Sequence, residues 1–365
     1  MRKKTGIIRS IIVSKLKKHP YKLNFAVTSA CNSRCKTCNV WRGYNSNSNL
    51  QKKDLSLREI EKIFISAPKS FVWLSLSGGE PFLRKDLVEI CNIALQNLPS
   101  LSLISIPTNG LLQDTVIKKV QEILSLPLAN LFINFSLDGP EKIHDKIRGI
   151  SGAYKKTWST YQNILALSGK EPRLAVNLET TISKYNLKYL ESFFRKLTTE
   201  GHKITVTIAH KGYLYQNLED NKSFTGLNHD SKTLNRVIDI IKKNLKISSV
   251  IDLVERIYLE RISEFYRKPR IQPLTCIALE SSIAIDAKGN ITPCFMWNRI
   301  LGNIRDFNLD LKRFSTKRKQ EILKTRKLIK AGYCPNCWTP CEAYQSIINS
   351  LLTLKIFGSP NQLSL

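Results

Sequence analysis

The sequence predicts an α/β fold, namely a partial (β/α)6 TIM-like barrel followed by a small cysteine-rich domain. Six apolar runs of strand length alternate with amphipathic runs of helical length between residues 23 and 209. Such alternation is typical of a parallel sheet covered by helices. Three cysteines lie near the start of the chain and five near its end, with Cys91 alone between them. The length of 365 residues accommodates one large domain and one smaller domain.

Each expected element follows from its own pattern of apolar residues. The expected strands are residues 23–29, 71–77, 101–107, 131–137, 173–182 and 203–209. The expected helices between them are residues 55–66, 85–98, 113–125, 153–168 and 187–200. Polar motifs follow the first four strands, and the loops at the carboxyl ends of parallel strands carry the function of such barrels. We therefore expect the functional site at that end of the sheet.

The pattern divides the chain into five segments. They are a basic amphipathic segment (1–22), a barrel core (23–212), a connecting helical region (213–273), a cysteine-rich domain (274–345) and a tail (346–365). In the connecting region, a weakly patterned polar stretch, 213–232, precedes a helical stretch, 233–268. In the cysteine-rich domain, residues 283–286 and 291–294 flank Gly289, which predicts a hairpin with glycine in the turn.

Basic residues dominate the composition. Lysine and arginine outnumber the acids by 57 to 29, and the net charge is +28. The excess is strongest in residues 1–20 and 312–330, which together contain one acid, Glu321. Such runs usually form a solvated helix face, but they also suit peripheral contact with an anionic membrane or binding of an anionic substrate. We find no transmembrane span and no secretory signal, so we expect a cytoplasmic protein with reduced cysteines.

The first cysteine group is Cys31-x-x-x-Cys35-x-x-Cys38, which places three thiols on one short loop. A structural zinc site closes with four ligands. A 4Fe–4S cluster held by three cysteines instead leaves one iron free to bind another molecule. The spacing alone permits both, because a distant fourth cysteine could complete a zinc site.

The wider context resembles the radical S-adenosylmethionine (SAM) superfamily. Ser77-Gly78-Gly79-Glu80-Pro81 follows the second expected strand, and the resemblance spans about residues 22–210. It implies that Cys31, Cys35 and Cys38 hold a 4Fe–4S cluster whose free iron binds the amino and carboxylate groups of SAM. Reductive cleavage of SAM would then yield methionine and a 5′-deoxyadenosyl radical, which abstracts a hydrogen atom from the substrate.

The resemblance also implies which residues hold SAM. They are Gly78, Gly79, Glu80, Thr108, Asn109, Ser136, Asp138 and Arg148. The glycines would let the backbone approach the ligand, and Glu80 offers an acceptor to the methionine ammonium group. Arg148 is the candidate for the SAM carboxylate, although Asn-Gly and Asp-Gly are also ordinary turn sequences. Thr37 departs from the aromatic residue that many members carry near the adenine, and Trp41 could take its place.

The second cysteine group resembles the SPASM and Twitch auxiliary-cluster domains. It consists of Cys276, Cys294, Cys334, Cys337 and Cys341. A full SPASM domain binds two clusters with more cysteines, so these five imply one auxiliary 4Fe–4S cluster. The expected ligands are Cys276, Cys294, Cys334 and Cys337, with Cys341 as an alternate. A structural zinc site fits the same spacing. Cys91, on an apolar helix, is expected to be a buried small hydrophobe.

We therefore expect a radical SAM oxidoreductase. The substrate would be a small molecule that loses two electrons, the auxiliary cluster would accept the second, and a flavodoxin or ferredoxin-type protein would reduce the first cluster. The alternative is a peptide- or protein-modifying maturase of the SPASM class, although the 22 residues before the first strand leave little room for a leader-binding module. A third hypothesis is a non-catalytic basic zinc protein that binds nucleic acid, but the sequence shows no recognition helix or aromatic-studded sheet.

Overall fold

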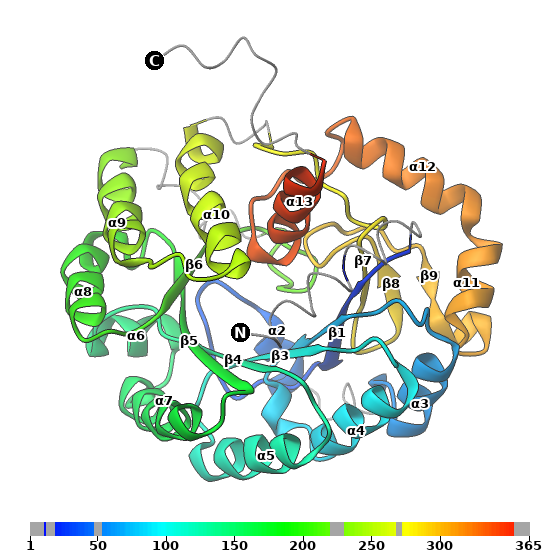
Figure 1. Cartoon of the computed structure of the whole chain (residues 1–365), viewed down its shortest axis with the longest axis horizontal. Coiled ribbons are helices and arrows are strands. Elements are labelled where there is room, and N and C mark those ends of the chain that lie inside the picture. Colours follow the sequence, from blue (N-terminus) through cyan, green and yellow to red (C-terminus); the bar gives the residue numbers. More distant parts are fainter. Residues whose placement is uncertain (1–10, 12–18, 47–52, 220–229, 268–271, 354–365) are drawn as a thin grey trace.

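The computed structural model describes residues 11, 19–46, 53–219, 230–267 and 272–353. Its strands form one nine-stranded sheet in the order β6-β5-β4-β3-β2-β1-β7-β8-β9. The first six strands run parallel to their neighbours and the sheet curves without closing, with helices around its outer side (Figure 1). The expected fold class, a partial (β/α)6 barrel, is confirmed.

The six expected strands and five expected helices all occur, with ends shifted by at most a few residues. The strands are β1 (Lys22–Thr28), β2 (Trp73–Gly78), β3 (Leu103–Thr108), β4 (Leu131–Ser136), β5 (Leu174–Ile182) and β6 (Ile204–Ile208). The helices are α3 (Leu57–Ser66), α4 (Leu87–Asn97), α5 (Gln113–Ser125), α7 (Ala153–Lys170) and α8 (Leu187–Thr199). Cys91 is buried on α4, as predicted.

Local sequence explains both kinds of element. Helix α3 begins at a capping box in which Ser56 and Glu59 satisfy each other's backbone donors. On β5, Leu174 and Leu178 belong to the main apolar core, whereas Glu179 faces the opposite side of the sheet because side chains alternate along a strand. The outer face of the sheet is therefore apolar under the helices, and the inner face can be polar.

Some helices were not expected from the sequence. They are α2 (Val40–Ser46), the 3-10 turn η2 (Pro81–Leu83) and α6 (Glu141–Arg148). The expected helical stretch 233–268 is two helices, α9 (Ser231–Asn244) and α10 (Val250–Arg267). The break has a local cause, because the Ser249 hydroxyl accepts from the Asp252 amide and donates to the Asp252 carboxylate. Ser249 thereby caps the start of α10.

The cysteine-rich segment continues the sheet of the barrel. Strand β7 (Ser282–Ile285) pairs in parallel with β1, and β8 (Asn290–Thr292) pairs antiparallel with β7. Gly289 lies in the turn between them at a φ of +87°, so the predicted hairpin is confirmed. Strand β9 (Gly302–Asn303), the 3-10 turn η4 (Ile304–Phe307), and helices α11 (Leu311–Lys317), α12 (Lys319–Lys330) and α13 (Pro340–Leu352) follow.

Helices α10 and α13 pack against each other beside β6 and β1, where the barrel stays open (Figure 1). The Tyr258 hydroxyl on α10 donates to the Val206 carbonyl on β6, 3.0 Å away. On the other side, Lys22 Nζ donates to the Cys341 carbonyl at 2.8 Å, and Asn24 donates to Glu342 at 3.1 Å. Side chains of β1 thus hold the first turn of α13 against the barrel.

Most of the expected basic amphipathic segment lies outside the described residues, which include Ile11 but not 1–10 or 12–18. Ile11 is buried in a small apolar cluster with Tyr21, Val72 and Leu103. The end of the expected tail, 354–365, also lies outside them. Within the described chain, no helix combines the length and apolarity that crossing a membrane requires.

Candidate functional site

The polar motifs that follow the first four strands meet at one end of the sheet. The Asn109 side-chain amide donates to Asn32 in the cysteine loop, at 2.7 Å. The backbone of that loop also meets the end of α6, because the Arg34 amide donates to the Arg148 carbonyl at 2.8 Å. Ser136, at the end of β4, stands in register with Glu179 on β5. The parallel sheet therefore brings together motifs that are separated by more than a hundred residues.

Gly78 and Gly79 allow the loop after β2 to touch the loop after β1. A Cβ atom on Gly78, whose φ is +130°, would lie 2.2 Å from the Thr28 carbonyl oxygen. One on Gly79 would lie 2.0 Å from the Ala30 carbonyl oxygen and 3.0 Å from the Cys31 Cβ atom. Any side chain here would displace the backbone next to the first cysteine. The glycines are thus required by contact between two loops of the protein itself.

The Glu80 carboxylate is 2% exposed and points into the protein. It accepts hydrogen bonds from the Thr108 hydroxyl at 2.9 Å, the Asn109 amide at 2.7 Å and the Phe82 amide at 3.2 Å. Burial raises the pKa of Glu80 to about 7, and these hydrogen bonds oppose the rise. Glu80 therefore ties the ends of β2 and β3 together, a role that its sequence motif did not reveal.

The thiols of Cys31, Cys35 and Cys38 are neighbours in a loop that is packed from two sides. Burial, followed by the negative charge of Cys35, raises the pKa of Cys38 to about 12, and the same two causes raise the pKa of Cys31. Trp41 donates from Nε1 to the Cys35 carbonyl at 3.3 Å, and the Thr37 carbonyl accepts from Asn217 at 2.8 Å. Three neighbouring, partly exposed thiols that repel each other as thiolates fit a cationic iron centre.

Arg148 has a carboxylate partner within the protein. Its Nε atom lies 2.8 Å from Asp138 Oδ2, and its Nη1 atom lies 3.7 Å from Cys35 Sγ. Burial disfavours the charged guanidinium, but Asp138 and Cys35 together hold the pKa of Arg148 above its ordinary value. His144 accepts from the Asp138 amide at 3.1 Å, and burial lowers the pKa of this imidazole to about 3. His144 is therefore a neutral residue that packs locally and accepts a hydrogen bond.

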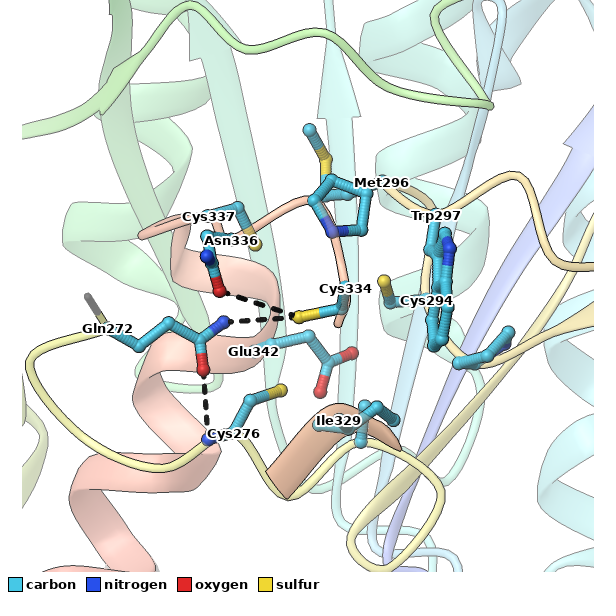
Figure 2. A pocket seen from close by; sticks show the side chains of 13 residues that line it. Gln272, Cys276, Cys294, Met296, Trp297, Ile329, Cys334, Asn336, Cys337 and Glu342 are labelled. Atoms are coloured by element: carbon cyan, nitrogen blue, oxygen red, sulfur yellow. Dashed lines mark hydrogen bonds between the residues drawn. The ribbon is translucent and has the colours of Figure 1, made fainter. Parts of the chain in front are cut away.

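The second cysteine group surrounds one pocket (Figure 2). Cys276, Cys294, Cys334 and Cys337 all line it, together with Glu342. Figure 2 shows that their side chains come from the chain before β7, the segment after β8 and the loop before α13. Burial and then the charge of Glu342 raise the pKa of Cys294 to about 12. Four cysteines around one pocket provide the ligand type of an iron–sulfur cluster and also of a zinc ion.

Cys341 stands apart from this pocket, although only three residues separate it from Cys337. It is not among the described residues that line the pocket. It lies in the first turn of α13, where Lys22 binds its carbonyl. Burial raises the pKa of the Cys341 thiol, and the charge of Lys22 opposes that rise. The direction of the helix at Pro340 separates Cys341 from the other four cysteines.

A single zinc ion holds each sulfur at about 2.3 Å, so its ligands must crowd closely together. Within the described parts of the chain, no three cysteine, histidine, aspartate or glutamate side chains are arranged in this way. Within each group, the described cysteines are therefore neighbours, but they are not close enough together to ligate a single metal ion.

Polar residues that were not predicted as site residues also line the inner face of the sheet. Asn24 on β1 stands in register with Ser75 on β2, and Asn134 on β4 with Asn177 on β5. Glu179 continues this polar row on β5. The signal was present, because these residues alternate with apolar ones inside the expected strands. The inner face of the sheet is consequently polar at these positions, whereas its outer face is apolar.

An open α/β barrel with a cysteine loop after its first strand is the architecture of radical SAM enzymes. Residues 25–197 match the Radical SAM superfamily, and this part of the chain is a radical SAM domain. Membership of this family implies a 4Fe–4S cluster and SAM as cofactors.

Among curated proteins, the chain is 31% identical over 153 residues to GTP 3′,8-cyclase of Pasteurella multocida (strain Pm70), which covers 40% of this chain and 44% of that protein. It is 31% identical over 178 residues to Fe-coproporphyrin III synthase of Methanosarcina barkeri (strain Fusaro / DSM 804), covering 48% of this chain and 40% of that protein. The similarity thus spans less than half the length of these two relatives.

Among solved structures, the fold is similar to anSMEcpe with bound AdoMet and Kp18Cys peptide. The TM-score is 0.57 at 15% identity, and the match covers 92% of this chain and 96% of that one. SuiB of Streptococcus suis bound to S-adenosylmethionine has a TM-score of 0.52 at 15% identity, covering 85% of this chain and 69% of that one. These similarities concern the fold.

Proposed function

We propose that the chain oxidises a small molecule by two electrons, with one iron–sulfur cluster that binds SAM and a second that accepts an electron. The observation that supports this most directly is the position of Tyr215. Its carbonyl accepts a hydrogen bond from the Asn39 amide, next to Cys38, at 2.8 Å. Burial raises the pKa of its hydroxyl, and the charges of Cys341, Glu179, Cys38 and Cys337 add to this rise. Tyr215 therefore contacts the segment of the first cysteine group, and the charges of the second group also act on it.

In this proposal, Cys31, Cys35 and Cys38 hold the first cluster, which with SAM supplies hydrogen-atom abstraction. Glu80 fixes the loops beside it through Thr108 and Asn109. The other predicted SAM-binding residues, Gly78, Gly79, Ser136, Asp138 and Arg148, keep that role as part of the proposal. Cys276, Cys294, Cys334 and Cys337 hold the second cluster.

The electrons balance over one turnover. An external donor of the flavodoxin or ferredoxin type supplies one electron for the cleavage of SAM. With SAM and both clusters bound, the substrate would lose one hydrogen atom to the SAM-derived radical. It would then lose a proton to solvent and an electron to the second cluster, so that an alcohol, for example, would become a carbonyl. Full ligation by four cysteines suits a cluster that passes electrons, because it leaves no iron free.

The test is anaerobic reconstitution with iron and sulfide, followed by reduction with dithionite and measurement of 5′-deoxyadenosine. The wild-type chain should hold about eight irons and cleave SAM. Cys35→Ala should form no 5′-deoxyadenosine, whereas the matched control Cys91→Ala, buried on α4, should behave like wild type. Wild-type amounts of product from Cys35→Ala would refute the assignment.

The second candidate is modification of a peptide or protein. The fold supports it through its similarity to anSMEcpe, which was solved with a peptide. Fractions of a cell extract, added to the reconstituted enzyme, distinguish the two. If the substrate is a small molecule, a fraction treated with protease should still stimulate the formation of 5′-deoxyadenosine. If the substrate is a peptide, protease treatment should abolish that stimulation.

Cyclisation of GTP, the activity named for several relatives, is a weaker candidate. Glu179 lies on the inner face of the sheet, where its charge would repel a triphosphate. The nearby cations are engaged, since Arg148 pairs with Asp138 and Lys22 binds the Cys341 carbonyl. GTP therefore serves as a negative control in the assay.

A further inference from the structure

Residues 212–217, which we call the strap, cross from the second cysteine group to the first. At one end, the Tyr213 amide donates to the Met296 carbonyl at 3.2 Å. The Leu214 amide donates, at 3.0 Å, to the carbonyl of the residue directly after Cys294. Met296 also lines the pocket of the second group (Figure 2). The first half of the strap is therefore paired with the chain that follows one of the four cysteines of that pocket.

The other end of the strap holds the later half of the first cysteine loop. The Tyr215 carbonyl accepts from the Asn39 amide at 2.8 Å, and the Gln216 carbonyl accepts from the Asn39 side chain at 3.2 Å. The Asn217 side chain donates at 2.8 Å to the carbonyl of Thr37, which lies between the last two cysteines of that loop. Gln216 has a φ of +50°, a left-handed conformation that costs free energy in a residue other than glycine, and these hydrogen bonds hold it there.

Asn217 joins the two ends of the strap through a side chain that is 1% exposed. Its Oδ1 atom accepts from the Gly212 amide at 2.8 Å. Its Nδ2 atom donates to the Thr37 carbonyl and, at 3.2 Å, to the His210 carbonyl. Gly212 lies directly against Met296, because a Cβ atom on this glycine would be 2.9 Å from the Met296 Cε atom. A continuous path of contacts thus runs from the first cysteine loop to the second cysteine pocket, and it needs both the acceptor and the donors of a carboxamide.

We propose that Asn217 is a positioning residue, which fixes the later half of the first cysteine loop relative to the second cysteine pocket. This inference rests on the proposed function, because two clusters that exchange an electron through the substrate must keep one separation. Electron transfer weakens steeply as that separation grows. The earlier half of the loop is held independently by α6, where the Ile147 carbonyl accepts from the Lys36 amide at 2.9 Å. Loss of the Asn217 side chain should therefore loosen only the later half.

The test is hydrogen exchange of single backbone amides in the reconstituted, SAM-loaded and unreduced protein. Asn217→Leu keeps a similar volume and removes all three side-chain hydrogen bonds. It should speed exchange about tenfold at the Asn39 amide, which reports on the first group, and at the Tyr213 amide, which reports on the second. The Lys36 amide should be unchanged. The matched control Asn163→Leu removes an exposed amide whose hydrogen bond stays within α7, and it should change none of the three.

A second variant keeps the test decisive if Asn217→Leu does not fold. Asn39→Ala removes only the exposed hydrogen bond to the Gln216 carbonyl, and it should speed exchange at the distant Tyr213 amide to a smaller extent. In the reduced proteins, pulsed EPR measures the distance between the two clusters. The distribution of this distance should be broader in Asn217→Leu than in the wild type.

The inference is overturned if exchange at Tyr213 stays at the wild-type rate in both variants, or if the distance distribution of Asn217→Leu equals that of the wild type. Iron content, zinc content and SAM cleavage are measured separately. Zinc in the second site would refute the proposed function, and the exchange rates would still decide whether the strap connects the two groups. Two intact clusters without a response at Tyr213 would refute the positioning role alone.

Discussion

Arg148 and Asp138 form a buried ion pair, with Nε 2.8 Å from Oδ2 and side-chain exposures of 12% and 2%. The same guanidinium lies 3.7 Å from the sulfur of Cys35. Arg148 at the end of α6 therefore connects the segment after β4 to the cysteine loop after β1. An arginine that the sequence offered as a ligand for SAM also organises the loop that is expected to hold the cluster.

Asp138→Asn should destabilise the protein strongly. It removes the counter-charge of a buried arginine, which costs about 3–5 kcal/mol when one partner is lost. Asparagine can still accept a hydrogen bond from the Thr181 amide, so the measured loss of stability reports the removal of the negative charge. Urea unfolding of the cluster-free protein measures it, and Asp239→Asn, which breaks an exposed pair with Lys242, is the control. Equal effects of the two substitutions would contradict the expectation.

Glu80→Gln should weaken SAM binding about tenfold while the cluster is retained. Glutamine has one acceptor oxygen in place of two, so at least one hydrogen bond to the loops after β2 and β3 is lost, at a cost of about 1–3 kcal/mol. Calorimetry on the reconstituted protein measures the affinity, and the iron content verifies the cluster. Glu61→Gln, an exposed residue on α3, is the control. An unchanged affinity in Glu80→Gln would show that the carboxylate does not shape the SAM site.

Cys334→Ala should reduce the iron content from about eight to about four, whereas Cys341→Ala should retain about eight. The reason is geometric, because Cys334 lines the pocket, whereas Cys341 is not among its described lining residues and its carbonyl accepts from Lys22 at the start of α13. Iron, sulfide and zinc analysis of both variants measures this. Core SAM cleavage should survive in each. About four irons plus one zinc in the wild-type chain would show instead that the second site is structural.

The Glu59–Arg305 pair should couple the barrel to the cysteine-rich segment in a pH-dependent way. Hydrogen bonds from Arg305, at 2.6 and 3.1 Å, hold the pKa of Glu59 at about 2, below its ordinary value. The stabilisation is therefore present at neutral pH and is lost as the pH falls from about 5 toward 2. Because Arg305 is 37% exposed, we expect about 0.5–1 kcal/mol.

A double-mutant cycle with Glu59→Gln and Arg305→Met measures this coupling at pH 7 and at pH 3. Glu61→Gln, also on α3 but without an ion pair to this turn, should show no coupling to Arg305→Met. A coupling energy of zero at pH 7 would show that the pair is fully solvated and does not connect the two segments.

The basic surface of α11 and α12 should bind anionic bilayers at low salt. Its exposed residues are Lys312, Arg313, Lys317, Arg318, Lys319, Lys324, Lys327 and Lys330. Each such charge is worth about 1 kcal/mol at an anionic membrane, and salt screens it. Flotation with phosphatidylserine vesicles should therefore succeed at low salt and fail at high salt. Charge reversal of Lys319, Lys324 and Lys327 should abolish flotation. If the wild type does not float at any salt concentration, these charged residues interact only with solvent.

Local sequence was sufficient to determine the barrel and the position of its site. A strand buried under helices needs a run of apolar residues, and a helix on its surface needs an apolar stripe, so both periods are visible without a structure. The end of each strand was also predictable, because the apolar run ends there. Since parallel strands end at one edge, the meeting of Cys31, Gly78 and Asn109 followed from their positions in the sequence.

Only the tertiary structure determined which groups the polar residues of the site contact. The partners of Glu80, Arg148 and Lys22 lie 29, 10 and 319 residues away, and no local pattern encodes such distances. The pairing of β7 with β1 and the separation of Cys341 from the pocket of the other cysteines have the same origin. Hydrogen bonds and ion pairs depend on which chain segments the folded sheet places side by side, and periodicity records only which face of an element is buried.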